Sequence, residues 1–291
     1  MLRFFTLQAE WFRHVWEVFV VDRPYEKGKQ IRSYEIMDFL GAGGYGMAYL
    51  VRHRSSGERY VMKQLRPSSK KNKQGLRAHQ NEIDMLSQLH HPAIPTLVEQ
   101  FEWQQQEFVV MAWVEGATFW EQIFEQGVRY SHAEAFQMLH KLLDIVQHIH
   151  QKGIVHRDLR IPNVIVHEDR LFVIDFGLAC KQDDSRPFLW EQTRQDPAFD
   201  PRKAPFCQSD HYALAHLVLF LLYSSYEPAA NESERSWQEE LGLPSRARQL
   251  LERMLQVKAP FRSTEELSTE VENLIKNHMD DAQNPSTPPV S

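Results

Sequence analysis

The most restrictive feature of this sequence is a charged turn at residues 156–163 (HRDLRIPN), which is followed by two apolar runs. The runs, residues 164–166 and 171–174, are rich in β-branched side chains and flank a polar segment at residues 167–170. This pattern predicts a β-hairpin. Because a hairpin brings its two ends together, we expect Asn163 and Asp175 to meet at the same end.

Asp158, Asn163 and Asp175 carry side chains suited to moving a phosphoryl group. That chemistry needs an acid near the nucleophile, oxygen ligands for Mg²⁺ and a rigid frame. Mg²⁺ prefers carboxylate and amide oxygens, which Asn163 and Asp175 supply, whereas Asp158 can receive a proton. The alternative is a surface turn with incidental acids. The combined order and spacing of the motifs argue against it.

A second motif, G-x-G-x-x-G, occupies residues 41–46. Alone this motif is weak evidence, because dinucleotide-binding folds have the same glycine pattern at the start of a helix. Residues 47–52 instead predict a strand, so the glycines would form a hairpin lid whose backbone can approach phosphate oxygens. Lys63 and, nineteen residues later, Glu82 follow this motif. A semi-buried lysine needs a counter-ion, which Glu82 can supply; the alternative for Glu82 is an exposed helix acid.

Together these motifs resemble those of the eukaryotic-like (Hanks-type) serine/threonine protein kinases over residues 31–277, and we expect a bacterial member. The resemblance implies an α+β, bilobal fold with a small antiparallel sheet lobe carrying one main helix, and a larger, mostly helical lobe. The expected divisions are residues 1–30 (N-terminal aromatic helix and linker), 31–114 (small lobe), 115–279 (large lobe) and 280–291 (disordered tail).

The resemblance implies an enzyme that transfers the γ-phosphoryl group of ATP to Ser or Thr hydroxyls of protein substrates. It assigns Asp158 as the catalytic base and Asn163 and Asp175 as ligands of Mg²⁺, with Mn²⁺ as the alternative ion. The other catalytic residues that it implies are Lys63, Arg160 and Thr193. The ATP-binding residues that it implies are Leu40, Gly41, Ala42, Gly43, Gly44, Tyr45, Gly46, Ala48, Val61, Lys63, Glu82, Met111, Ala112, Trp113 and Ile165.

Within that set, Met111, Ala112 and Trp113 match the gatekeeper and hinge, whose backbone would hydrogen-bond the adenine edge. Ala48, Val61 and Ile165 match the positions that enclose the adenine ring. Val61 is bulkier than the usual alanine, which would tighten the pocket.

The chain also departs from the family pattern. Arg160 stands where these kinases normally have lysine. Its guanidinium is planar and forked, whereas the ammonium of lysine is compact. Residues 198–200 (AFD) replace the usual Ala-Pro-Glu. We expect Asp200 to pair with Arg262, and Asp210 to anchor the backbone of the catalytic loop.

Ser185 is the only hydroxyl residue between residues 178 and 192. We therefore expect activity without phosphorylation of this segment, with Arg157 meeting an acid such as Glu191 instead of a phosphate.

The residues leave two other functions open. One is a pseudokinase, a nucleotide-binding or scaffolding module; the complete set of Lys63, Glu82, Asp158, Asn163 and Asp175 argues against it. The other is a small-molecule kinase on the same fold. Thr193, at the peptide-positioning threonine of the family, favours a protein substrate.

The composition is that of an ordinary globular protein, with 42% hydrophobic and 25% charged residues among 291. A net charge of −6 gives no indication of a nucleic-acid partner, and the basic cluster at residues 66–77 is predicted to be a solvated loop. Cys180 and Cys207 fit a reducing cytosol, with a redox switch as the less favoured alternative. We see no apolar run long enough to cross a bilayer and expect a cytoplasmic protein.

Residues 1–22 carry an aromatic stripe that would lie on one face of a helix. We expect it to pack against the domain, a second copy or another partner, since its polar face has few basic residues for a membrane surface. Residues 22–29 are predicted to be a linker.

Periodicity predicts the remaining elements. The expected strands are residues 34–40, 48–53, 58–65 and 108–113, and the expected helices are residues 80–89, 131–153, 210–223, 244–255 and 264–276. Capping boxes at Ser131–Glu134 and Ser263–Glu266 mark two of the helix starts.

Overall fold

The computed structural model describes residues 22–44, 46–69, 73–183, 199–227 and 235–283. Its internal contacts divide the chain into two compact units. Unit 1 comprises the chain up to Val114 together with Phe176–Leu178, and unit 2 comprises Glu115–Asp175 and the chain from Ala179 onward. The predictions made for residues 1–21, Tyr45, Ser185, Glu191 and Thr193 lie outside the described residues.

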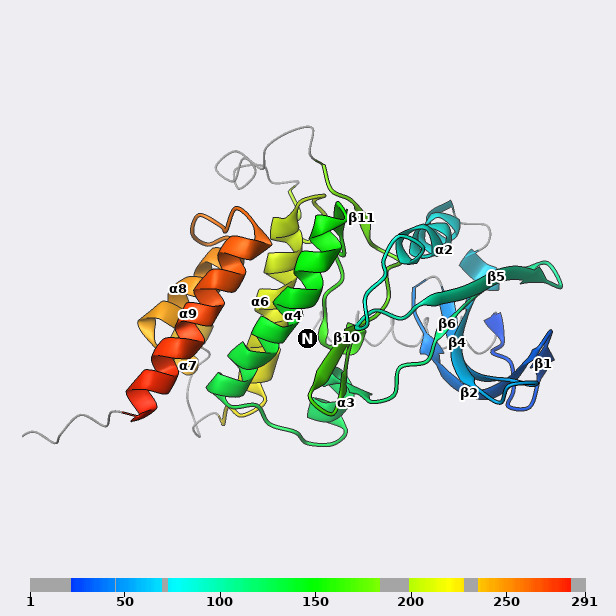
Figure 1. Ribbon diagram of the computed structural model, residues 1–291, viewed down its shortest axis with the longest axis horizontal. Helices are drawn as coiled ribbons and strands as arrows, with labels where there is room; N and C mark the ends of the chain where they lie inside the picture. The colour runs from blue at the N-terminus through cyan, green and yellow to red at the C-terminus, as the bar shows by residue number, and fades with distance from the viewer. Residues whose placement is uncertain (1–21, 45, 70–72, 184–198, 228–234, 284–291) are drawn as a thin grey trace, which may run out of the picture. The chain divides into compact units, whose positions relative to one another are not determined.

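Unit 1 is built on a six-stranded antiparallel sheet in the order β1-β2-β3-β4-β6-β5 (Figure 1). The strands are β1 (Gln30–Ile31), β2 (Tyr34–Ala42), β3 (Gly46–His53), β4 (Arg59–Leu65), β5 (Leu97–Trp103) and β6 (Gln106–Ala112). The four predicted strands of this unit are therefore confirmed. Strand β5 was not singled out from the sequence, because it is an edge strand whose residues are largely solvent-accessible and show no clear apolar alternation.

The pairing register gives the sheet two distinct faces. Residues directly opposite in an antiparallel ladder point to the same side. Ala48 pairs with Lys63, and Val61 pairs with Met111, so these four side chains share one face. The other face closes over the core of the unit, which contains Ile31, Tyr34, Ile36, Met47, Tyr49, Val51, Met62, Phe101, Phe108 and Val110.

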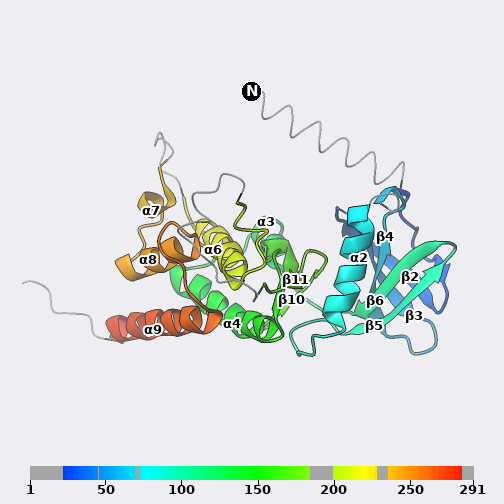
Figure 2. The ribbon, with the colours of Figure 1, turned by 90° about the horizontal axis from the view of Figure 1, so that it is seen from above.

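Helix α2 (Lys73–Leu86) packs against β4 and β5, and Figure 2 shows it beside the sheet. It begins seven residues before the predicted start at residue 80, because its first turns carry no apolar repeat to reveal them. The predicted solvated loop at residues 66–77 is thus wrong at its C-terminal end. It is also wrong at its N-terminal end, where Arg66 is buried.

Unit 2 is mostly helical. Its helices are α3 (Phe119–Phe124), α4 (His132–Gln151), α6 (Cys207–Tyr223), α7 (Trp237–Glu240), α8 (Ser245–Met254) and α9 (Thr264–Gln283). Helix α4 packs against α6 and α9 (Figures 1 and 2). Short strands complete the unit: β7 (Ala117–Thr118), β9 (Val164–His167) and β10 (Arg170–Val173) form one sheet, and β8 (Ile154–Val155) pairs with β11 (Cys180–Lys181).

Helix α4 shows why the longer helices could be predicted. Ser131 Oγ accepts a hydrogen bond from Glu134 N at 3.3 Å, and Glu134 Oε2 accepts one from Ser131 N at 2.8 Å, as the capping box predicted. Such a cap contributes about 1 kcal/mol. Packing contributes more, because fully burying each apolar side chain is worth about 1.5–3 kcal/mol. Those with no exposed surface include Leu139, Leu142, Leu143, Val146 and Ile149.

Gly116 is required by a close approach of two backbone segments in unit 2. Its φ is +132°, and a Cβ there would lie 2.3 Å from Val166 O and 2.9 Å from the side chain of Ile165. A side chain at this position would push β9 away from β7, with which it pairs.

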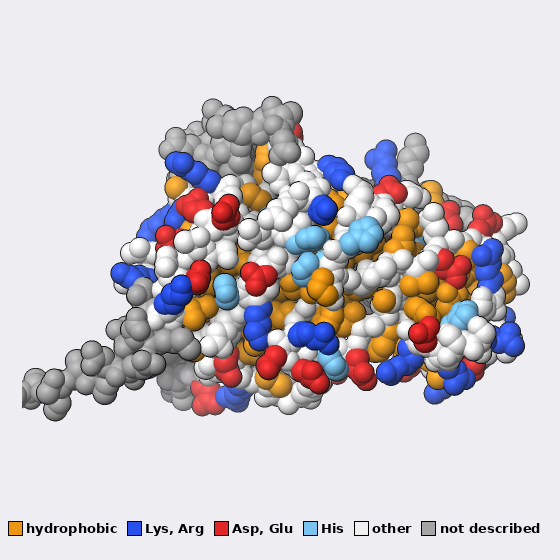
Figure 3. All heavy atoms as spheres, viewed as in Figure 1, with side chains coloured by type: hydrophobic (Ala, Val, Ile, Leu, Met, Phe, Trp, Pro, Cys, Tyr) orange, Lys and Arg blue, Asp and Glu red, His pale blue; other side chains and the backbone are white. Residues whose placement is uncertain are grey.

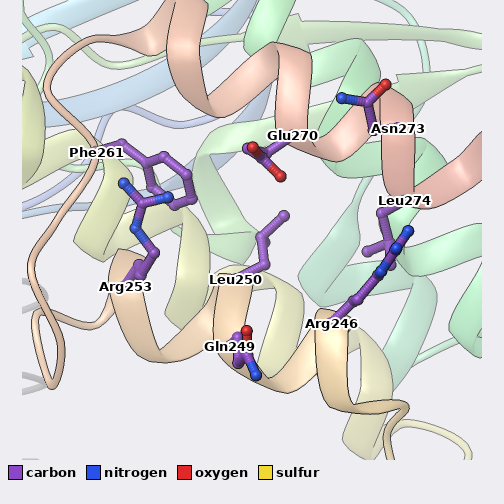
Figure 4. Close-up of a pocket in the computed structure, with 8 residues that line it drawn as sticks. All are labelled: Arg246, Gln249, Leu250, Arg253, Phe261, Glu270, Asn273 and Leu274. Atoms are coloured by element: carbon purple, nitrogen blue, oxygen red, sulfur yellow. The ribbon is translucent and has the colours of Figure 1, made fainter.

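A pocket of about 430 Å³ lies between α8 and α9 (Figure 4). Leu250, Phe261 and Leu274 provide its apolar lining, while Arg253 lies 3.7 Å from the Phe261 ring centre and is paired with Glu266 at 2.7 Å. None of the residues assigned to catalysis or ATP binding lines it.

The described surface carries both signs of charge. On the face drawn in Figure 3, Lys and Arg side chains are interspersed with those of Asp and Glu. None of the described helices combines the length and the apolar character needed to cross a membrane.

Candidate active site

The predicted hairpin after the charged turn is confirmed. Strands β9 and β10 are antiparallel, with Val164 opposite Val173. Ile174 N donates to Asn163 O at 3.0 Å, which continues the ladder one step beyond the paired strands. Asn163 and Asp175 therefore emerge at the same end of the hairpin, as expected from the sequence.

Asp158 is held by two neighbours. Arg160 donates to both carboxylate oxygens, from Nε at 2.5 Å and from Nη2 at 2.9 Å. Asn163 Nδ2 donates to Asp158 Oδ2 at 2.7 Å and to Asp158 O at 2.9 Å. The Asp158 side chain is 12% exposed and that of Arg160 is 62% exposed. Because the Arg160 guanidinium is largely exposed, water and an incoming group can reach it and displace it from the carboxylate.

The orientation of Asn163 suits a cation. Both partners of its Nδ2 are acceptors, so the amide nitrogen faces Asp158 and the carbonyl oxygen faces away. The side chain is buried, and its hydrogen bonds to Asp158 use Nδ2 alone. The described residues contain no group of three or more His, Cys, Asp and Glu able to hold a metal unaided. An ion at Asn163 and Asp175 would therefore need further oxygens from a bound phosphate, which is the usual mode for Mg²⁺.

Asp210, near the start of α6, anchors the backbone of the catalytic loop. Its Oδ2 accepts from His156 N at 2.8 Å, and its Oδ1 accepts from Arg157 N at 2.7 Å. Arg157 has a φ of +63°, a left-handed conformation that costs a non-glycine residue about 1–2 kcal/mol. Two hydrogen bonds to a charged carboxylate, each worth about 1.5–3 kcal/mol, outweigh that strain. The predicted anchoring role of Asp210 is confirmed.

Burial and neighbouring charged or hydrogen-bonding groups shift the pKa values of Asp210 and His156 in opposite directions. Burial raises the pKa of Asp210, but the hydrogen bond from His150 and the other donors outweigh it, so that the pKa lies below its ordinary value. Burial lowers the pKa of His156, against the opposing charges of Asp210, Asp158 and Asp175. The carboxylate is thus ionised, and His156 is neutral at neutral pH.

A chain of buried hydrogen bonds continues from Asp210 into the helical core. His150 Nε2 lies 2.8 Å from Asp210 Oδ2, and His150 Nδ1 lies 2.6 Å from Thr264 Oγ1. His211 Nε2 lies 2.9 Å from the same hydroxyl, while its buried Nδ1 has no partner in the described part of the chain. The Asp210 carboxylate can only accept, so a neutral His150 donates to it from Nε2 and accepts from the Thr264 hydroxyl at Nδ1, which leaves that hydroxyl to accept from His211. We therefore infer that His211 donates to Thr264, which donates to His150, which donates to Asp210.

In unit 1, Lys63 and Glu82 are brought together as predicted. Lys63 Nζ on β4 donates to Glu82 Oε1 on α2, and their side chains are 18% and 6% exposed, respectively. The carboxylate supplies a counter-ion for the lysine in this semi-buried position. Lys63 shares the sheet face of Ala48, Val61 and Met111, so the sheet itself presents an ammonium next to small and medium apolar side chains.

The glycine-rich motif forms the turn between β2 and β3, not the start of a helix. Gly43 N donates to Gly46 O at 2.8 Å, and Arg66 Nη1 donates to Gly43 O at 3.1 Å. The assigned hinge lies at the end of β6, where Ala112 is the last residue paired with β4. The backbone N–H and C=O of Trp113 therefore lie beyond that ladder.

The expected pair of Asp200 with Arg262 is wrong. Asp200 instead accepts from Arg202 at 3.1 Å and lies 3.2 Å from Lys203 Nζ, because both bases follow it within a tight turn. These contacts, led by the Arg202 hydrogen bond, lower the pKa of Asp200 to about 2. Arg157 Nη1 donates to Lys203 O at 2.9 Å, while its predicted contact with Glu191 lies outside the described residues.

The roles of Asp22, Arg66 and His211 were not predicted from the sequence. Asp22 was assigned to a linker, but it is buried and its carboxylate lies 2.6 Å from Arg66 Nε. The signals available for these residues were weak. Arg66 directly follows a predicted strand, and His211 interrupts an otherwise apolar helix face.

The strand-rich unit with its Lys63–Glu82 pair and the helical unit with its anchored catalytic loop define a protein kinase. A family model for the protein kinase domain matches residues 34–280. The chain belongs to this family, and the predicted bilobal α+β kinase fold is confirmed.

Several relatives are named as serine/threonine-protein kinases, the class in which we place this chain. The "Probable serine/threonine-protein kinase YbdM" of Bacillus subtilis (strain 168) is 33% identical over 258 residues, covering 88% of this chain and 95% of that protein. The human NUAK family SNF1-like kinase 1 is 27% identical, covering 84% of this chain and 39% of that protein. The crystal structure of the Mycobacterium tuberculosis PknI kinase domain, 21% identical, matches with a TM-score of 0.64 over 86% of this chain and 99% of that one, which supports the fold.

The His211 network predicts a pH dependence of stability. Burial lowers the pKa of His211 from 6.5 to about 3, with His150 adding to the effect and Asp210 opposing it. Between these two values the unfolded state binds a proton that the folded state does not, so the free energy of unfolding falls as the pH falls. We expect thermal unfolding of His211→Leu to be less sensitive to acid between pH 6.5 and 4.5, by up to about 1.4 kcal/mol per pH unit. The exposed His132→Leu serves as the control. Equal slopes in His211→Leu and the unaltered chain would contradict the assignment.

Proposed function

We propose that this kinase transfers the γ-phosphoryl group of ATP to Ser or Thr hydroxyls of protein substrates. The observation that carries the proposal is the cluster formed by Asp158, Arg160 and Asn163, with Asp175 at the same end of the β9–β10 hairpin. It supplies an acid for the acceptor, a cation for phosphate and oxygen ligands for a metal, from the anchored loop and from the segment that follows β10.

In the proposed reaction, Asp158 orients the acceptor hydroxyl and receives its proton. Asn163 already holds one oxygen of this carboxylate, which fixes the side chain before substrate arrives. Arg160 occupies both oxygens, so the hydroxyl must displace at least one of its two N–H donors. The freed guanidinium can then neutralise charge on the transferred phosphoryl group.

Asn163 Oδ1 and the Asp175 carboxylate are the groups that we assign to the divalent cation. The family uses ATP with a divalent metal, and Mg²⁺ is our proposal for this chain, with Mn²⁺ as the alternative. When bound, the ion would neutralise charge on the phosphate oxygens. Thr193, which lies outside the described residues, stays a proposed peptide-positioning residue.

Lys63, held by Glu82, is assigned to the α- and β-phosphates. The glycine-rich turn from Leu40 to Gly46 is assigned to the phosphates as well. The adenine ring is assigned to Ala48, Val61 and Ile165 and its edge to the hinge backbone at Met111–Trp113. Support comes from the shared sheet face of Ala48, Val61, Met111 and Lys63.

We assign the protein to the cytoplasm, where its unpaired cysteines, half-buried Cys180 and buried Cys207, would stay reduced. A protein substrate is the proposed partner besides ATP. The aromatic stripe in residues 1–21 is a proposed contact for a second copy or another protein.

Incubation with labelled ATP, Mg²⁺ and a general protein substrate tests the function. We expect Lys63→Ala and Asp175→Asn to lose at least about 100-fold in kcat/KM, because each removes charge stabilisation of the transferred group. Asp144→Asn on the exposed side of α4 is the matched control and should retain activity. Nucleotide binding without transfer by the unaltered chain would reject the enzyme and favour a pseudokinase.

Arg160 provides a separate prediction. Arg160→Lys keeps the charge but cannot hold both Asp158 oxygens in a planar fork, so kcat should stay within about tenfold of the unaltered value. Arg160→Ala should lower kcat by about 100-fold, since no cation remains beside the phosphoryl group. Arg129→Ala, which removes an exposed surface pair with Glu227, is the control. Full activity of Arg160→Ala would show that the guanidinium takes no part in transfer.

A further inference from the structure

Arg66 joins three segments of unit 1 that are far apart in sequence. Its Nε lies 2.6 Å from Asp22 Oδ2, and its Nη1 donates to Gly43 O at 3.1 Å. The Asp22 carboxylate is further held by Ser68, whose backbone N donates to Oδ1 at 2.8 Å and whose Oγ donates to Oδ2 at 3.1 Å. The Arg66 side chain is 3% exposed and that of Asp22 is fully buried.

The sheet register explains how Arg66 reaches the glycine-rich turn. Gly46, the first residue of β3, pairs with Leu65, the last residue of β4. Arg66 is the next residue after this pair, so it emerges directly beside the turn. Gly43 then has both backbone groups engaged, its N–H by Gly46 O and its C=O by the guanidinium.

Fixing a peptide carbonyl in a glycine-rich turn also fixes where the neighbouring N–H groups point. A turn of glycines has many accessible conformations, and ordering it on binding would reduce affinity for phosphate. A charged donor that already holds one carbonyl removes part of that cost. Loss of this donor should therefore weaken the binding of phosphate groups and leave the binding of a nucleoside unchanged.

Asp22 holds the guanidinium in place. The carboxylate neutralises the buried charge of Arg66, while Ser68 satisfies carboxylate lone pairs that the arginine leaves open. Three residues further on, Tyr25 packs on Tyr49 and Phe108 with ring centres 5.9 and 6.4 Å apart, so the chain entering β1 is fastened to the sheet. A buried ion pair is seldom needed for stability, because apolar residues of similar size often serve as well.

We propose that Arg66 is a positioning residue for the glycine-rich turn, and that Asp22, N-terminal to the sheet, sets the affinity of that turn for nucleotide phosphates by holding Arg66. The inference rests on the proposed function, since it assumes that this turn contacts the phosphates of ATP.

The test uses the full chain and compares ATP with adenosine. Arg66→Lys keeps a charge beside Asp22 but cannot bridge the carboxylate and Gly43 O with a planar fork. Asp22→Ala removes the acceptor that holds the guanidinium. For both variants, we expect the Kd of Mg·ATP to rise about tenfold, equivalent to one well-placed hydrogen bond. The Kd of adenosine should stay within about twofold, and KM for ATP should rise more than kcat falls.

Arg52→Lys is the matched control, because Arg52 on β3 pairs with Glu35 on β2 at 2.9 Å without touching the turn. Equal ATP affinity in the unaltered chain, Arg66→Lys and Asp22→Ala would overturn the proposal. So would parallel losses for ATP and adenosine, which would indicate only a structural role. If Asp22→Ala does not fold, Arg66→Lys decides alone. Failure of the unaltered chain to bind ATP would instead reject the proposed function on which the inference rests.

Discussion

The catalytic half of this protein depends on one buried carboxylate. Asp210 comes from α6 but accepts the backbone N–H groups of His156 and Arg157, and so ties a strained loop to the helical core. The loop has no regular structure of its own to hold it between β8 and the 3-10 turn at Ile161–Asn163. Without this charge, the left-handed residue Arg157 would relax, and Asp158 follows it directly in the chain, with Asn163 five residues further on.

Each unit contains charged side chains that are buried or partly buried and are paired with other groups. In unit 1 these are the Lys63–Glu82 and Arg66–Asp22 pairs, and in unit 2 donors converge on Asp210. Partly or fully buried charges of this kind are costly unless paired. Arg66 and Asp210 also bind backbone groups, of the glycine-rich turn and of the catalytic loop, and so fix the positions of segments that phosphate chemistry needs to be ordered.

The sequence was informative where local chemistry and periodicity agree. The hairpin that joins Asn163 to Asp175, the capping box of α4 and the pairing of Lys63 with Glu82 all follow from short-range patterns or from a motif set of known spacing. Asp210 was found through the resemblance, since nothing local marks a buried aspartate as an anchor.

The rest depends on contacts between distant residues. Asp22 and Arg66 are separated in sequence by the four strands β1 to β4 and were predicted to be linker and loop, so their ion pair could not be read from a local pattern. The Asp200–Arg262 expectation was wrong because two nearby bases, Arg202 and Lys203, meet the carboxylate first. The start of α2 was missed because helix formation there leaves no apolar repeat in the sequence.

Hydrogen exchange at the amides of His156 and Arg157 tests the central claim most directly. In the unaltered chain, both amides should exchange as slowly as those in the buried turns of α4, because both donate to a buried carboxylate. In Asp210→Ala, both should exchange rapidly while α4 stays protected. Rapid exchange in the unaltered chain, or undiminished protection in the variant, would contradict the role of Asp210 as the anchor of the catalytic loop.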